Sequence, residues 1–98
     1  MATPIHKVFM GRFLEPWYQL SEEERKSFIA KLDQALERVG GKRPTICDSS
    51  WSSDQWVIAG IEEFPNIEAV QKYMAAVNEL KLFRYVESIS VLGTKIES

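Results

Sequence analysis

Apolar and polar positions follow two different periods along the chain, and each change of period indicates a new element. Residues 5–13 are rich in β-forming side chains and predict a first strand. Gly11 within this strand marks a bend or a close approach of another backbone. Pro16 ends the strand because it lacks a backbone donor, and the segment up to residue 20 shows no period.

A helix is the clearest element of the first half. Ser21 and Glu24 stand at the spacing of a capping box, in which each side chain accepts a hydrogen bond from the backbone amide of the other residue. Gly40 and Gly41 supply the C-terminal stop, since glycine tolerates a left-handed conformation. The apolar positions recur at spacings of three and four and share one helix face: Phe28, Leu32, Ala35, Leu36 and Val39.

The second half has the order strand, strand, helix, strand. Residues 43–51 predict a weak strand, and a serine-rich hairpin loop separates it from a strong strand at residues 56–61 that is apolar on both faces. Asn66 is a candidate N-cap for the second helix, which is expected to end between residues 78 and 83. The last strand is expected over residues 85–92.

This element order predicts a single ferredoxin-like βαββαβ domain of the α+β class over residues 1–98. The expected sheet is antiparallel with strand order 4-1-3-2, and both helices lie on one of its faces. The other face is also apolar, because Val8, Phe9 and Met10 follow one another in the first strand. A bare apolar face is unusual in a monomer, so we expect a homodimer that covers it through a two-fold axis.

The chain ends in a characteristic way, with Leu82-Phe83-Arg84-Tyr85-Val86-Glu87 followed by Val91-Leu92-Gly93. With this ending, the element order and the long first connection, it resembles the dimeric α+β barrel superfamily over nearly its whole length. The ending also resembles small uncharacterised and darcynin-like families. Members of the superfamily include cofactor-independent monooxygenases, polyketide cyclases, lactone isomerases and haem-binding proteins. The resemblance therefore implies a dimeric barrel but does not select one reaction.

Composition narrows the range of partners. The net charge of −2, from 12 basic and 14 acidic residues, disfavours nucleic acid and anionic membranes as partners. The expected strand at 56–61 lacks the basic residues of an RNA-recognition motif, whereas a small regulatory amino-acid-binding domain remains open. No apolar run approaches the roughly 20 residues of a membrane span. The start of the chain lacks signal-peptide features, and one cysteine fits a reducing compartment, so a cytoplasmic protein is expected.

One histidine is the first candidate for chemistry. His6 is the only side chain with an ordinary pKa near neutrality, and the expected sheet brings it close to Glu62 or Glu63, which would orient it as a general base. The alternative is a solvated histidine at a strand end. Tyr73 is expected to face the sheet and to serve as its polar partner in a helix–sheet cleft. Cys47 is expected to be a buried structural thiol.

Neither a metal nor a cofactor is expected, because one histidine and one cysteine provide no ligand cluster. A haem held by the single histidine stays open without positive support. An ion pair between Arg12 and Glu87 is expected from the order of the strands.

Aromatic residues in the connections are candidates for ligand binding. They either line a pocket for a flat apolar molecule or close the barrel ends and cement the dimer: Trp17, Tyr18, Trp51, Trp56 and Tyr85. Two functions follow from these observations. The first is a binder of a hydrophobic or aromatic small molecule, as a cofactor-independent cyclase, isomerase or monooxygenase. The second is a non-catalytic dimeric structural or regulatory module.

Overall fold

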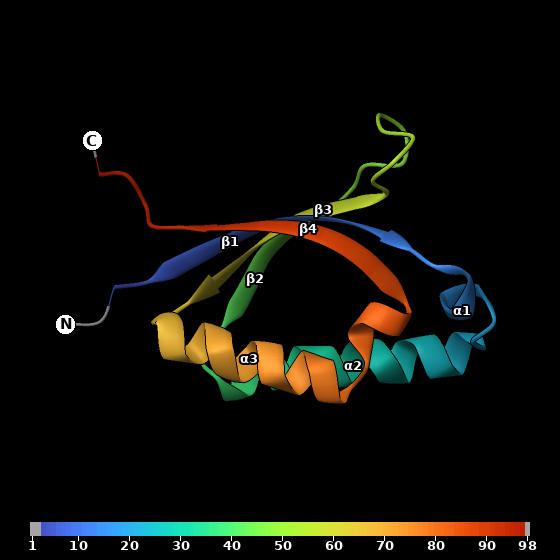
Figure 1. The fold of residues 1–98 in the computed structure, drawn as a ribbon, viewed down its shortest axis with the longest axis horizontal. Coiled ribbons are helices and arrows are strands. Elements are labelled where there is room, and N and C mark those ends of the chain that lie inside the picture. Colours follow the sequence, from blue (N-terminus) through green and yellow to red (C-terminus); the bar gives the residue numbers. More distant parts are fainter. Residues whose placement is uncertain (1–2, 98) are drawn as a thin grey trace.

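A computed structural model describes residues 3–97 and contains one four-stranded antiparallel sheet with the two long helices on one face (Figure 1). The sheet order β2-β3-β1-β4 is the predicted 4-1-3-2 order read from the opposite edge, so the ferredoxin-like fold is confirmed. The elements run in chain order β1 (Ile5–Phe13), α1 (Glu15–Tyr18), α2 (Glu22–Arg38), β2 (Lys42–Asp48), β3 (Ile58–Phe64), α3 (Ile67–Glu79), the 3-10 turn η1 (Leu82–Arg84) and β4 (Val86–Gly93).

Local signals predict the helix starts correctly. Ser21 and Glu24 form the expected capping box, with distances of 3.1 Å from the Glu24 amide to the Ser21 hydroxyl and 2.9 Å from the Ser21 amide to the Glu24 carboxylate. Asn66 caps α3 by accepting a hydrogen bond from the Ala69 amide at 2.8 Å. Gly40 follows α2 with a φ of 77°, a left-handed conformation that glycine adopts without a steric cost.

The boundaries of β2 and β3 differ from the prediction. β3 begins two residues later than expected, at Ile58, and continues through two glutamates to Phe64. It continues because its register with β1 is unbroken, so that Glu62 lies opposite Lys7. β2 ends at Asp48, whose carboxylate accepts hydrogen bonds from the following turn. The first connection also contains the short helix α1, which tolerates Pro16 in its first turn.

The hydrophobic core lies between the sheet and the helices α2 and α3. Phe64 and Val77 are each only 1% exposed, and Leu36 of α2 packs against the same cluster. Within residues 3–97, no helix is long and apolar enough to span a membrane.

The sheet has a second face that no helix of residues 3–97 covers (Figure 1). We call it the open face, and its apolar centre consists of residues that are 37% to 67% exposed: Val8, Met10, Ile61, Ile89 and Val91. Cys47 of the edge strand β2 also lies on this face, because it pairs with Ala59 of β3, which pairs in turn with Met10. The prediction of a buried thiol is therefore wrong, since an edge strand with an uncovered face leaves the sulfur exposed.

Candidate functional site

A cavity of about 200 Å³ lies between the sheet and the two long helices. Its walls are mainly apolar, and they come from all four strands, from the helices α1, α2 and α3 and from η1. Gly11 belongs to its floor, where an added Cβ would lie 3.3 Å from the Ile58 side chain. The atoms near Gly11 belong to the side chains of Ile58 and Val86, so the close approach here is one of side chains and not, as predicted, of another backbone.

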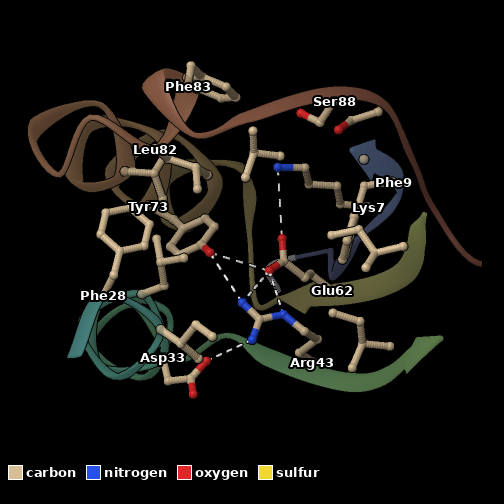
Figure 2. A pocket seen from close by; sticks show the side chains of 18 of the residues that line it. Lys7, Phe9, Phe28, Asp33, Arg43, Glu62, Tyr73, Leu82, Phe83 and Ser88 are labelled. Carbon is tan, nitrogen blue, oxygen red and sulfur yellow. Dashed lines mark hydrogen bonds and ion pairs between the residues drawn. The ribbon is translucent and has the colours of Figure 1, made fainter. Parts of the chain in front are cut away.

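Five polar side chains meet at one end of this cavity, and we call them the polar cluster: Lys7, Asp33, Arg43, Glu62 and Tyr73 (Figure 2). Glu62 lies at the centre and is 3% exposed. Its Oε2 accepts hydrogen bonds from Nε and Nη2 of Arg43, at 3.1 and 2.9 Å, and lies 3.4 Å from the Tyr73 hydroxyl. The Arg43 Nη1 donates to Asp33 at 2.8 Å. The guanidinium is therefore held between two carboxylates.

Strand pairing brings these residues together. Lys7 and Glu62 are direct cross-strand neighbours, and both point toward the helices. Arg43 reaches the same place because the pairing of β2 with β3 shifts register between Lys42 and Thr45. This irregularity sets Arg43 and Pro44 against the single residue Glu62, and bulges of this kind re-aim a side chain and accommodate proline.

The Lys7 ammonium faces the cavity without a hydrogen bond to any oxygen of the described residues. Its nearest polar neighbours are the Glu62 Oε1 at 3.8 Å and the Met74 sulfur at 3.7 Å. It also lies 5.9 Å from the centre of the Tyr73 ring. Burial lowers the pKa of Lys7 below its usual value, and Arg43 adds to this effect while Glu62 opposes it.

Arg43 and Tyr73, the two other ionisable donors of the polar cluster, keep their protons at neutral pH. Burial opposes the charge of Arg43, but the hydrogen bonds and charges of Asp33 and Glu62 outweigh it and raise the pKa of the guanidinium. Burial, reinforced by the charge of Glu62, raises the pKa of Tyr73 to about 12. At neutral pH the cluster therefore contains a charged arginine and a neutral phenol.

The raised pKa of Tyr73 predicts a loss of stability at alkaline pH. An unfolded tyrosine ionises near 10, whereas folded Tyr73 ionises at about 12, so in this window the unfolded state releases a proton that the folded state keeps. Raising the pH from roughly 9 to 11 should therefore cost the wild type about 1 kcal/mol more than Tyr73→Phe. Denaturant unfolding of both proteins across this range measures the difference. If the difference in unfolding free energy between the two proteins does not change with pH, the phenol is solvated.

His6 lies on the other side of the sheet. Its Nε2 is 3.5 Å from the Glu63 Oε1, so the predicted proximity to a glutamate is confirmed. Side chains alternate along β1, however, and Lys7 takes the position that faces the helices. The expectation that His6 and Tyr73 share a helix–sheet cleft is therefore wrong: Tyr73 lines the cavity, and His6 belongs to the open face.

The residues that line the cavity also decide whether it fits a haem that is held by the single histidine. Among the described residues that line it there is neither a histidine nor a cysteine, and the Tyr73 hydroxyl is engaged by Glu62 and Arg43. The cavity therefore does not fit a haem that is held by the single histidine. The described residues also contain no group of three or more side chains that would hold a metal ion.

The predicted aromatic residues separate into two groups. Trp17 is 8% exposed, lines the cavity and stacks on Phe13 with ring centres 5.0 Å apart. Tyr85 packs edge-on against Trp17 and thereby supports this wall without lining the cavity. The three others lie away from this cavity: Tyr18 and Trp51 are exposed, and Trp56 is half-buried next to the β2–β3 hairpin.

Lys7, Arg43 and Glu62 were not predicted as site residues, although Glu62 was expected as a neighbour of His6. One signal was present in the sequence. Lys7 is the only charged residue among the alternate positions 5, 7, 9, 11 and 13 of β1, which otherwise carry apolar residues or glycine. A charge on the buried side of a central strand needs a partner, and that requirement indicates a buried ion pair.

Comparisons with known proteins extend to the fold alone. The sequence matches no protein-family model and no curated protein. Solved structures of chlorite dismutase from Candidatus Nitrospira defluvii superpose with a TM-score of 0.75 at 14% identity over 99% of this chain. The chain spans only 42% of the length of that protein. A protein of unknown function from Rhodopseudomonas palustris is similar with a TM-score of 0.71 and 18% identity, over all of this chain and 86% of that one. The chain thus has the ferredoxin-like fold of the dimeric α+β barrel type.

Proposed function

We propose that this protein binds a small molecule with an apolar or aromatic body in the helix–sheet cavity. The observation that carries the proposal is the combination of mainly apolar walls with a single buried polar cluster at one end. Ligand sites in proteins have this composition, because apolar walls supply affinity and a few polar groups fix the orientation. Tyr73 and Trp17 are the two predicted site residues that line the cavity.

The chemistry that suits this cluster is proton transfer without a cofactor, as in an isomerase, a cyclase or a monooxygenase. The Lys7 amine, whose pKa burial lowers, faces the ligand space, while Glu62 and the neutral Tyr73 hydroxyl lie next to it. We assign His6 to the open face, where Glu63 orients it, rather than to this chemistry. Membership of a darcynin-like family stays a prediction.

We further propose that a second copy of the chain covers the open face. The apolar centre forms rows across the sheet, since Val8 pairs with both Ile61 and Val91. Polar pairs lie at its two ends: His6 with Glu63 at one end, and at the other the predicted ion pair of Arg12 with Glu87. An apolar centre with a polar rim is the composition of a protein interface, and a two-fold axis brings each apolar residue against an apolar surface.

A library experiment tests the ligand proposal. Native mass spectrometry of the protein with a library of aromatic and polyketide-like metabolites should yield at least one retained ligand. Ser88→Phe should abolish retention, because Ser88 lines the cavity and a phenyl ring there would fill it. Ser27→Phe, the same change at an exposed position outside the cavity lining, should leave retention intact. Retention by both variants would place the ligand elsewhere, and no retained ligand at all would favour the non-catalytic module.

A further inference from the structure

The buried part of the polar cluster has more positive than negative charge. Lys7 and Arg43 each bring a basic group, and their side chains are 14% and 20% exposed. Glu62 is the one deeply buried carboxylate among the described residues that line the cavity. The second carboxylate, Asp33, has a side chain that is 55% exposed, so solvent screens its charge.

Glu62 interacts mainly with Arg43. Its Oε2 receives two hydrogen bonds from the guanidinium, and the Tyr73 hydroxyl lies 3.4 Å from the same atom. Its Oε1 is 3.8 Å from the Lys7 nitrogen, which is an ion-pair distance but longer than a hydrogen bond. Arg43 in turn uses Nε and Nη2 for Glu62 and Nη1 for Asp33. Arg43 therefore positions Glu62, while Lys7 keeps donors for another acceptor.

Lys7 and Arg43 both line the cavity, and they lie on opposite sides of Glu62. Figure 2 shows the Lys7 amine above Glu62, on the side of the cluster toward Ser88, whereas Arg43 lies on the side toward Asp33. The rest of the lining is mostly apolar and includes the rings of Phe9 and Phe28, together with Ser88 and Ser90 of β4. A ligand that lies in this space places its body against these rings and one end against the ammonium.

We propose that the ligand is an organic monoanion, an apolar or aromatic carboxylic acid, whose carboxylate binds the Lys7 ammonium. This inference rests on the proposed function and specifies the class of ligand that the cavity selects. One added negative charge balances the surplus positive charge of the cluster and supplies the oxygen acceptors that Lys7 lacks. A buried charge is stable when it is both paired and hydrogen-bonded, so the carboxylate is preferred over a neutral group of the same shape.

Matched pairs of probes test this class directly. 2-Naphthoate and benzoate are compared with their neutral amides, 2-naphthamide and benzamide, by NMR titration of the protein. In the wild type, each acid should bind roughly 10-fold more tightly than its amide, because a hydrogen bond to a charged group contributes about one extra order of magnitude in affinity. Shifts should be largest for signals of cavity residues and for the Lys7 side chain.

Two lysine variants separate the effect of Lys7 from net charge. Lys7→Met retains a flexible apolar chain and should reduce the affinity for the acids by roughly 10-fold, to that for the amides. Lys31→Met removes one positive charge from an exposed position of α2 and should change neither affinity. If Lys7→Met does not fold, the wild-type ratio of acid to amide and the shift of the Lys7 side-chain signal on binding still decide the question.

The outcomes distinguish the two proposals. Equal binding of acid and amide in the cavity would overturn the preference for an anion and leave the ligand-binding function intact. Stronger binding of the acids that persists unchanged in Lys7→Met would overturn the role of Lys7. No perturbation of cavity residues by any of the four probes would contradict both proposals, because an apolar cavity that binds aromatic molecules should accept at least one of them.

Discussion

Glu62→Gln should lower the free energy of unfolding by about 3 kcal/mol, one of the two largest effects that we expect from a single substitution. The substitution keeps the size of the side chain but removes the carboxylate that lies between Lys7 and Arg43. Both basic groups are mostly buried, so the loss of their shared counter-charge leaves them poorly compensated in a medium of low polarity. Urea or guanidinium unfolding, followed by circular dichroism, measures this change.

The neighbouring glutamate provides a matched control. Glu63→Gln makes the same chemical change one residue along β3, where the side chain points to the open face and is 43% exposed. Its partner His6 is also partly exposed, and ion pairs of this kind contribute about 0–1 kcal/mol. We therefore expect a change of less than about 1 kcal/mol. Equal destabilisation by the two substitutions would mean that Glu62 is not the central counter-charge of a buried cluster.

Much of the fold is predictable because its signals are local. The capping box of Ser21 and Glu24 and the cap at Asn66 depend on residues three positions apart, so they can be read without knowledge of the tertiary structure. The order of the elements then restricts the sheet to one arrangement.

The candidate site depends on information that is not local. Neighbouring side chains of a strand point to opposite faces of the sheet, so a shift of one residue would exchange the places of His6 and Lys7. Which of the two residues faces the helices therefore depends on the whole sheet. Arg43 reaches Glu62 only through the irregular pairing between Lys42 and Thr45, and no short sequence pattern predicts that irregularity. Cys47 is exposed since its strand lies at an edge, which is likewise a property of the whole sheet.

The second large effect concerns the proposed dimer. Val91→Glu should convert the protein from a dimer to a monomer, with a dissociation constant at least roughly 100-fold higher, because dimerisation would bury an unpaired carboxylate. The monomer should remain folded, since Val91 is 67% exposed and its side chain contributes little to the core. In sedimentation velocity at micromolar concentration, the wild type should have about twice the chain mass of 11.3 kDa and the variant the mass of one chain.

Ile96→Glu is the control for the dimer experiment. It introduces the same charge at a residue that is 88% exposed and lies beyond the end of β4, outside the open face. We expect it to sediment as the wild type does. Val91 pairs with Val8, which pairs in turn with Ile61, so a carboxylate at position 91 lies at one end of an apolar row, whereas one at position 96 lies outside it. If the wild type sediments as a monomer, the proposed dimer is refuted, and no second copy of the chain covers the exposed apolar rows.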